Sequence, residues 1–260
     1  MAVFADQMLR QINLTHTPRR IISVVPSQSE FLFDLGLQEE VIGITKFCIH
    51  PNSWYRSKTR IGGTKTLNLE KIAALRPDLI IGNKEENQQE QMEWLIQRFP
   101  VWMSDIKTLP DATNMMYLLG KLLQKETQAE AIINSIELSF GDIKPKVLSS
   151  CAYLIWKNPF ICAASNTFIN DLLGRSGFTN VFSHLDRYPE INEKMLQEAQ
   201  PEIIFLSSEP FPFKMEHIKE FEKYCPNAKV QLVDGELFSW YGSRLIKAAP
   251  YLKNLSQKFG

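Results

Sequence analysis

The sequence predicts an α/β protein of two similar lobes with mostly parallel sheets, joined by one long helix. Three observations predict this fold class. Short apolar runs alternate with helical patterns along the chain, which is typical of parallel α/β sheets. Two sequence patterns recur in the same order in both halves, and an uninterrupted helical pattern lies between them. We therefore expect an N-terminal lobe over 1–107, a linking helix over 108–141 and a C-terminal lobe over 142–260.

Six apolar runs predict the buried strands, because each is short and is bounded by turn residues or by a helical pattern. These runs are 20–25, 78–82, 101–104, 146–156, 202–207 and 229–235. Since helical patterns separate them, most neighbouring strands are expected to run parallel with helical crossovers.

Two patterns occur once in each half. The stretch "FLFDLG" at 31–36 is similar to "FINDLLG" at 168–174, and each predicts a helix that ends at a glycine. The stretch "LEKIAALRPDLIIG" at 69–82 is similar to "NEKMLQEAQPEIIFLS" at 192–207. Each predicts a helix, a proline turn and a buried strand. Two matches in the same order indicate two lobes of similar design.

The linking helix is predicted from a start signal and from helical spacing. Thr108 and Asp111 form a capping-box pattern with Pro110 in the first turn. The apolar positions that follow are Met115, Leu118, Leu119, Leu122, Leu123, Ala129, Ile133 and Ile136. About 28 residues of helix would extend roughly 42 Å, which is too long for one crossover. The alternative is a pair of helices broken near Gly120 or Thr127.

Charge and hydropathy exclude several classes of protein. Lys and Arg number 29, Asp and Glu also number 29, and this balance argues against binding to nucleic acid or to anionic membranes. No apolar run approaches the ~20 residues that a membrane-spanning helix needs. The first twenty residues are polar and mixed, without the pattern of a signal peptide. Either a signal was removed or the protein is cytoplasmic.

The four cysteines do not suggest disulfides or a metal site. Cys48, Cys151, Cys162 and Cys225 have no C-x-x-C spacing, so they are expected to be buried small side chains. Cys48 and His50 alone have a spacing that a metal could use, and two scattered ligands are a weak signal. We expect no metal site and no catalytic cofactor.

The stretch "VVPSQSEF" at 24–31 tests whether the protein is an enzyme. A nucleophile elbow or a phosphate loop would need glycines around Ser27, and none is present. Ser27 and Glu30 instead predict a capping box, with a second cap of this kind near Asn166 and Thr167. This helix start follows a strand, where α/β sheets bind ligands. No nucleophile–base pair appears elsewhere, so a transferase or hydrolase is disfavoured.

Aromatic residues are concentrated in loops that follow predicted strands. They are Phe47, Trp54, Tyr55, Trp156, Phe160, Tyr188, Phe211, Phe213, Trp240 and Tyr241. Several aromatic side chains at strand ends favour a large, flat and mostly apolar ligand. Core packing is the alternative for about half of them, Trp156 and Phe168 above all.

Three segments together resemble a known family. "RIISVVPSQSEFLFDLG" (20–36), "GGTKTLNLEKIAALRPDLIIG" (62–82) and "DGELFSWYGSRL" (234–245) are similar to the cobalamin-, haem- and ferric-siderophore-binding proteins of ABC importers. The cobalamin-binding branch is the most similar, over nearly the whole chain. The resemblance implies a class III periplasmic-binding-protein-like fold with a helical backbone. It also implies a monomeric solute-binding protein, not an enzyme, that captures a corrinoid or iron chelate between its lobes.

The resemblance implies a set of ligand-binding residues from both lobes. They are Ser27, Gln28, Phe47, Gly63, Thr64, Asn83, Trp156, Phe160, Tyr188, Trp240 and Arg244. Arg244 would bind a carbonyl or an anion of the ligand; the alternative is an ordinary surface arginine at a helix start. The segment "NKEEN" at 83–87 stands where the family often has an aromatic residue, so haem or a ferric siderophore remains an alternative to a corrinoid.

The resemblance also implies docking to an ABC permease through one glutamate of each lobe. Glu70 matches in the first lobe, whereas the second matching position is Lys194, with Glu193 beside it. We therefore expect docking through Glu70 and Glu193. The family favours the periplasm or cell envelope, and the cytoplasm would follow if Met1 is the true start. An intracellular carrier or sensor of the same ligand is the second functional hypothesis.

Overall fold

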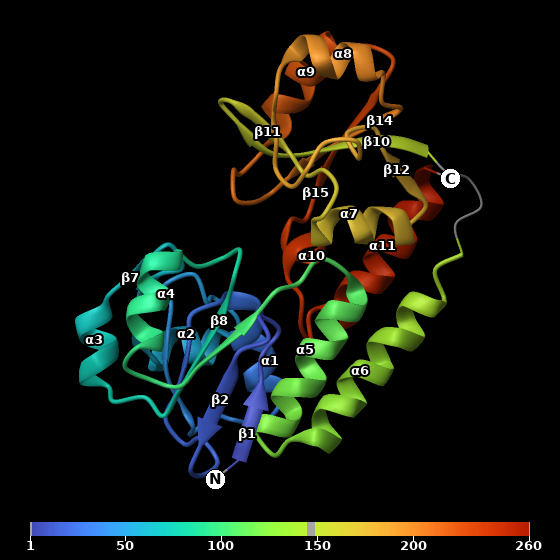
Figure 1. Ribbon diagram of the computed structural model, residues 1–260. Helices are drawn as coiled ribbons and strands as arrows, with labels where there is room; N and C mark the ends of the chain where they lie inside the picture. Colours follow the sequence, from blue (N-terminus) through green and yellow to red (C-terminus); the bar gives the residue numbers. More distant parts are fainter. Residues whose placement is uncertain (1, 145–148, 260) are drawn as a thin grey trace. The chain divides into compact units, whose positions relative to one another are not determined.

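The computed structural model describes residues 2–144 and 149–259, and it forms two compact units (Figure 1). Unit 1 comprises Met1–Ile106, Pro110–Ser135 and Tyr241–Arg244. Unit 2 comprises Lys107–Leu109, Ile136–Trp240 and Leu245–Gly260. Most of the predicted linking segment thus belongs to unit 1, and the exact lobe boundaries at 108 and 142 stay predictions.

Unit 1 is built on a fully parallel sheet with the strand order β5-β4-β3-β8-β9. The strands are β3 (Ile21–Ser23), β4 (Val41–Ile44), β5 (Thr59–Arg60), β8 (Leu79–Asn83) and β9 (Val101–Ser104). The central strands β3 and β8 are buried along their whole length, as their continuous apolar sequence requires. The strands predicted at 20–25, 78–82 and 101–104 are confirmed, whereas β4 and β5 were not predicted.

Short helices and two hairpins complete unit 1. They are α1 (Pro26–Asp34), α2 (Asn52–Ser57), α3 (Leu69–Ala74) and α4 (Gln89–Ile96), with hairpins β1 (Ala2–Ala5)–β2 (Gln11–Leu14) and β6 (Gly62–Gly63)–β7 (Thr66–Leu67). Helix α1 ends just before Gly36, whose φ is +80°. The predicted helix-ending glycine is therefore confirmed here, because this left-handed conformation favours glycine.

The prediction of one long linking helix is wrong. The structure has two helices, α5 (Leu109–Leu122) and α6 (Glu126–Gly141), as the alternative allowed. Gln124 adopts a φ of +55°, and the Lys125 N–H donates to the Gly120 carbonyl at 2.8 Å, which ends α5 in a Schellman motif. A Cβ on Gly120 would lie 2.6 Å from the Ala129 Cβ. Gly120 therefore allows α6 to pack closely on α5.

Unit 2 is built on a mixed sheet with the strand order β13-β11-β10-β14-β15 and with β12 also paired to β10. The strands are β10 (Ser149–Lys157), β11 (Phe160–Cys162), β12 (Phe178–Asn180), β13 (Glu190–Ile191), β14 (Ile203–Ser207) and β15 (Lys229–Val233). Strands β12, β10, β14 and β15 pair in parallel, whereas β11 and β13 are antiparallel. The strands predicted at 146–156, 202–207 and 229–235 are confirmed, with 146–148 outside the described residues.

The helices of unit 2 agree with the repeat only in part. They are α7 (Phe168–Arg175), α8 (Glu193–Ala199), α9 (Met215–Tyr224), α10 (Glu236–Ser239) and α11 (Leu245–Phe259). The predicted cap is confirmed, because the Thr167 side chain accepts a hydrogen bond from the Asn170 N–H. Gly174 lies inside α7 and does not end it, which corrects the prediction. The glycine that follows the helix with positive φ, +84°, is Gly177.

The second repeat, at 69–82 and 192–207, is confirmed, and its two copies also share a backbone conformation that their sequences do not reveal. In unit 1, α3 leads through a proline turn into β8, and in unit 2 α8 leads through a proline turn into β14. The residue before each proline has nearly the same left-handed backbone, with a φ of +47° at Arg76 and +45° at Gln200. The two units therefore share this turn down to its backbone conformation.

Cysteines and hydropathy agree with the predictions from the sequence. All four cysteines are free and buried. Across the described residues, none of the helices combines the length and the apolarity that crossing a membrane demands.

Candidate ligand-binding site

The predicted ligand-binding residues of the first lobe gather at one edge of the unit 1 sheet. Since β3, β4, β5 and β8 are parallel, the loops after them start from the same edge. Ser27 and Gln28 follow β3, Phe47 follows β4, and Asn83 ends β8. The Asn87 side-chain amide donates to the backbone carbonyls of both Val24 and Thr64, which ties these loops together.

Ser27 is not a helix cap. The N-cap residue of α1 is Val25, which has no side-chain cap, and Pro26 occupies the first turn. Ser27 lies two positions beyond the N-cap, too far along the helix to accept the first free N–H groups. Glu30 does not reach back either, because its carboxylate binds Arg244. The predicted capping box is therefore wrong, and Ser27 is a buried residue of the first turn.

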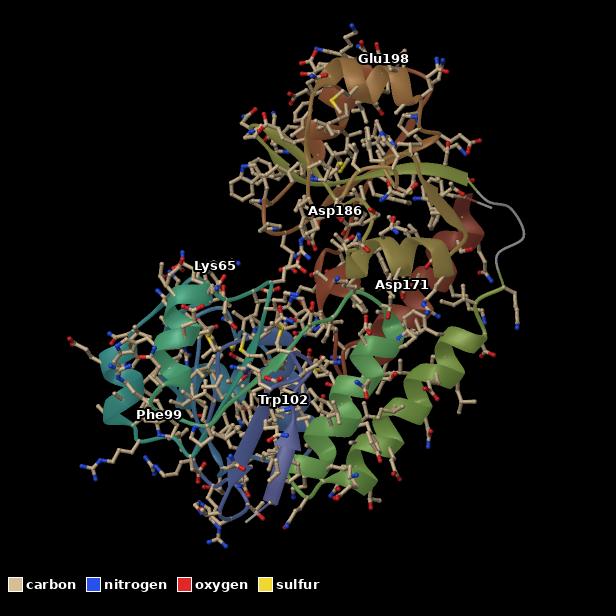
Figure 2. All side chains as sticks on the ribbon, viewed as in Figure 1. Lys65, Phe99, Trp102, Asp171, Asp186 and Glu198 are labelled. Atoms are coloured by element: carbon tan, nitrogen blue, oxygen red, sulfur yellow. The ribbon has the colours of Figure 1, made fainter. Side chains whose placement is uncertain are left out.

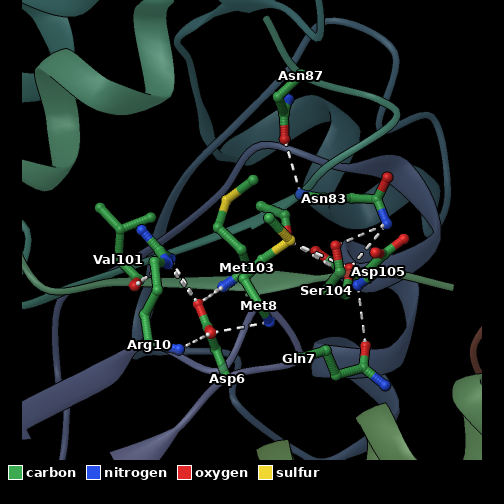
Figure 3. Close-up of polar contacts among 12 residues, drawn as sticks. Asp6, Gln7, Met8, Arg10, Asn83, Asn87, Val101, Met103, Ser104 and Asp105 are labelled. Atoms are coloured by element: carbon green, nitrogen blue, oxygen red, sulfur yellow. Dashed lines mark hydrogen bonds and ion pairs between the residues drawn. The ribbon is translucent and has the colours of Figure 1, made fainter. Parts of the chain in front are cut away.

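Gln28 and Asn83 form a buried polar network instead of a rim. The Gln28 amide donates to the Ser104 hydroxyl at 2.6 Å, and the Asn83 amide donates to the same oxygen at 2.9 Å. Asn87 closes the loop after β8, since its side-chain oxygen accepts from the Asn83 N–H at 2.8 Å (Figure 3). These hydrogen bonds place both side chains inside unit 1, where they hold the loops together, although the buried Gln28 Oε1 has no hydrogen-bond partner among the described residues.

Asp6 is a central polar residue that the sequence did not reveal. One carboxylate oxygen accepts from the backbone N–H groups of Met8 and Arg10, both at 2.9 Å. The other accepts from the Arg10 guanidinium and from the Met103 N–H (Figure 3). Asp6 thereby fastens the β1–β2 hairpin to β9, one residue before Ser104. The sequence signal for this role is weak: Asp6 lies in the short turn between two segments that could pair as a hairpin, 2–5 and 11–14.

Phe47 is an exposed side chain at this edge, and it lies over Gly63, which is buried. The Phe47 side chain is 50% exposed. A Cβ on Gly63 would lie 3.1 Å from the edge of the Phe47 ring, so the ring rests directly on the glycine backbone. An exposed aromatic ring supported by backbone can stack on a flat ligand.

The Cys48–His50 pair does not form a metal site in the described part of the chain. The Cys48 sulfur lies 3.1 Å from the Ser29 hydroxyl and 3.2 Å from that of Thr45. Burial raises the pKa of the Cys48 thiol, which disfavours the thiolate that metals bind. Among the residues that the structure describes, no three His, Cys, Asp or Glu side chains are grouped to hold a metal ion.

Arg244 is buried and paired with a carboxylate, so the alternative of an ordinary surface arginine is wrong. Its guanidinium donates two hydrogen bonds to the Glu30 carboxylate, at 2.7 and 2.9 Å, and both side chains are more than nine-tenths buried. Gly242 places the preceding backbone against α1, because a Cβ there would lie 2.9 Å from the Ser27 carbonyl oxygen. The segment Tyr241–Arg244 is thus a structural part of unit 1.

In unit 2, the predicted residues divide between surface and core. Trp156 is 39% exposed and packs edge-on against Phe211, with ring centroids 5.8 Å apart. Tyr188 is half-buried. Phe160 is buried against Phe221, with ring centroids 5.1 Å apart. Phe160 therefore belongs to the core, whereas Trp156 and Tyr188 keep surface that a ligand could contact.

Trp240 has a structural role next to a carboxyl group. Its ring is buried, and the indole N–H donates to Glu209 Oε1 at 3.0 Å. The Ser239 hydroxyl donates to the same oxygen at 2.7 Å. Burial, together with the nearby charges of Glu236 and Asp234, raises the pKa of Glu209. The folded protein therefore binds the Glu209 proton more tightly than the unfolded chain does, although the hydrogen bonds from Ser239 and Trp240 act in the opposite direction.

This raised pKa predicts a stability difference that depends on pH. A Glu209→Gln variant keeps an oxygen for both donors and cannot ionise. Because the folded state binds the Glu209 proton more tightly, the wild type loses stability relative to the variant as the pH rises above about 4. Urea unfolding from pH 4 to 8 measures the difference in unfolding free energy. A difference that stays constant over this range would contradict the assignment.

The two predicted docking glutamates lie at the starts of equivalent helices. Asn68 caps α3 by accepting from the Lys71 N–H, and Asn192 caps α8 by accepting from the Met195 N–H, each at 2.9 Å. Counted from these caps, Glu70 is the second helical residue of α3, and Lys194 holds that place in α8. Glu70, Glu193 and Lys194 are all exposed. The structure thus places Glu193 one position before the equivalent of Glu70.

Comparisons with known proteins bear on this arrangement. A family model described as "Periplasmic binding protein" matches residues 21–224. The vitamin B12-binding protein of Pectobacterium carotovorum is 25% identical over 240 residues, which cover 89% of this chain and 86% of that protein. The periplasmic haem-binding protein RhuT of Roseiflexus sp. RS-1 has a similar structure, with a TM-score of 0.79 at 17% identity over 93% of this chain and 97% of RhuT.

A third similar protein is named for a different ligand. The structure of an ABC-type Fe³⁺-hydroxamate transport system from Saccharomonospora viridis matches with a TM-score of 0.76 at 17% identity, over 100% of this chain and 99% of that one. At such identities, the two structural matches establish the shared fold alone.

Proposed function

Because the chain belongs to the periplasmic binding protein family, we propose that it captures a corrinoid or an iron chelate for delivery to an ABC importer. The family match over residues 21–224 is the observation that carries this proposal. Members of this family bind solutes for transport and are not enzymes. Accordingly, the ligand is cargo rather than a catalytic cofactor.

The ligand class is proposed from the relatives together with the exposed aromatic side chains. The names of the relatives include vitamin B12, haem and Fe³⁺-hydroxamate. Phe47 in unit 1 and Trp156 in unit 2 are exposed aromatic rings beside strand ends, which suits a large ligand with apolar faces. We propose that Phe47, Gly63, Thr64, Trp156 and Tyr188 contact it.

Ligand titration tests this proposal. Cyanocobalamin, cobinamide, haemin or a ferric hydroxamate should quench tryptophan fluorescence at micromolar concentration. Phe47→Ala and Trp156→Ala should each weaken binding about tenfold, because a stacked aromatic contact and its buried area contribute on the order of 1.5 kcal/mol. Tyr117→Ala is the matched control, since Tyr117 is similarly exposed but lies on α5. No binding of any of the four ligands would refute the proposal.

We further propose docking to a permease through Glu70 and Glu193. Both are exposed and lie in the first turns of short helices. Glu70→Lys should abolish the stimulation of ATP hydrolysis by the reconstituted importer from the same source, because a glutamate that docks through a salt bridge requires a basic group on the permease, which a lysine would repel. Lys194→Glu should preserve or increase it. Equal stimulation by the wild type and by a Glu70→Lys, Glu193→Lys double variant would contradict this docking mode.

The proposed place of action is the periplasm or the cell envelope, since the family consists of periplasmic binding proteins. We propose that the protein acts there as a monomer. Fractionation of cells that express the native gene, followed by intact-mass and size measurements, tests both points. A dimer or a purely cytoplasmic protein with its first methionine would favour the carrier or sensor hypothesis instead.

A further inference from the structure

The segment 41–69 contains three of the residues proposed to contact the ligand, Phe47, Gly63 and Thr64. It also has an excess of positive charge that the proposed function does not explain. It has five cationic side chains and no Asp or Glu, although the whole chain has a formal net charge of +0. The five are Lys46, Arg56, Lys58, Arg60 and Lys65. A local excess of one sign raises the concentration of ligands of the opposite charge at that surface.

Most of these cations have partners in the described structure. Lys58 donates to the Gln38 carbonyl oxygen and faces Glu39 and Glu40. Lys65, at the surface of unit 1 (Figure 2), donates to the Glu85 carbonyl oxygen. The Arg60 guanidinium lies 4.4 Å from the Tyr55 ring centroid. These contacts occupy the three side chains within unit 1.

Lys46 is placed differently, directly beside the exposed Phe47 ring. Its ammonium lies 5.0 Å from the Phe47 ring centroid, and the side chain is exposed. A Cβ on Gly63 would lie 3.1 Å from the Phe47 ring and 3.3 Å from the Lys46 Cε. Because glycine has no Cβ, the Phe47 ring and the Lys46 side chain can both pack against Gly63. Within the described residues, Lys46 makes no ion pair with a carboxylate.

From this juxtaposition, we infer that the ligand carries an anionic group, such as a carboxylate, at the rim of a flat apolar face. Phe47 packs on the face, and Lys46 binds the anion. This inference rests on the proposed function and narrows its ligand class. It favours macrocycles or chelates with acidic substituents over corrinoids whose side chains are neutral amides.

Two probes that differ only in their acidic groups test the inference. Haemin carries two carboxylates, and its dimethyl ester carries none, so both are titrated in the same co-solvent against the full chain. We expect haemin to bind about fivefold more tightly than the ester, which is the upper range for an exposed ion pair. Lys46→Gln should remove this preference, and Lys46→Arg should retain it. High salt should also reduce the preference of the wild type for haemin over the ester, because exposed charges are screened.

The chain offers a matched control variant. Lys121 lies 5.5 Å from the Tyr117 ring centroid on α5, so Lys121→Gln removes a similar lysine from a similar ring outside the proposed site. It should leave the preference unchanged. Equal affinity for haemin and ester, or an unchanged preference in Lys46→Gln, would overturn the inference while the proposed function stands. Failure of corrinoids, haemin and ferric hydroxamates to bind would instead refute the proposed function itself.

Discussion

Replacing Arg244 with methionine is expected to lower the free energy of unfolding by about 3–5 kcal/mol, because it leaves a buried carboxylate without its partner. Arg244 donates two hydrogen bonds to the Glu30 carboxylate, and the two side chains are only 8% and 9% exposed. Methionine keeps most of the apolar stem, so the loss is mainly electrostatic. Urea or thermal unfolding of the purified variant measures the change.

Two further variants separate the ion pair from general packing. The double variant Glu30→Gln, Arg244→Met removes the unpaired charge and should recover part of the loss. Arg175→Met breaks an exposed pair, since Arg175 binds Asp171 with a side chain that is 37% exposed. Its expected cost is at most about 1 kcal/mol. Similar losses in Arg244→Met and Arg175→Met would show that burial of the pair does not matter.

Gly62→Ala is expected to destabilise unit 1 by about 3 kcal/mol, from backbone strain and overpacking together. Gly62 has a φ of +104°, and a Cβ there would lie 2.4 Å from the Thr66 carbonyl oxygen and 2.9 Å from the Asn68 nitrogen. Both contacts are to backbone, so no side chain can move aside. The β6–β7 hairpin and the Asn68 cap of α3 would have to rearrange.

The matched control for Gly62 is Gly174→Ala. Gly174 lies inside α7, and an added Cβ would meet no described heavy atom within 4 Å apart from its chain neighbours and the backbone of its own helix. Alanine should therefore stabilise that helix by up to about 1 kcal/mol. Hydrogen exchange of the α3 amides, compared with those of α7, localises the effect. Unchanged exchange in α3 together with an unchanged unfolding midpoint would refute the prediction for Gly62.

The sequence predicted the features that depend on local pattern. All six predicted strands exist, and each helix–proline–strand repeat occurs in its own unit. The cap at Thr167 was also predicted, because its hydrogen bond reaches only three residues along the chain. Such features succeed because periodicity and capping depend on neighbouring residues.

The errors have physical causes that a local pattern does not contain. Pro26 fits the first helical position, which moved the start of α1 one residue ahead of the predicted cap at Ser27. The break between α5 and α6 depends on Gln124 in a left-handed conformation that usually requires glycine. The short strands β11 and β13 are held by pairing rather than by an apolar run.

The candidate site was predicted less well than the fold, because burial decides the role of each side chain. Gln28 and Arg244 have the polar groups that a ligand site needs, yet both bind partners inside unit 1. The partner of Arg244 is 214 positions away in the sequence. A resemblance to a family assigns a role to each matching position. It does not reveal that a polar side chain at such a position binds a distant residue of the same chain instead of a ligand.

The assignment of Tyr241–Arg244 to unit 1 has a consequence for how the chain is made. Unit 1 is nearly complete at Ile106 and Ser135, but its last segment ends at residue 244. At roughly 5–20 residues per second, the ribosome delivers Arg244 many seconds after Glu30. Until then Glu30 lacks the guanidinium that pairs with it in the folded protein. A nascent unit 1 that ends before residue 244 is therefore expected to be less stable than the unit in the full chain, by about the 3–5 kcal/mol assigned to loss of this partner.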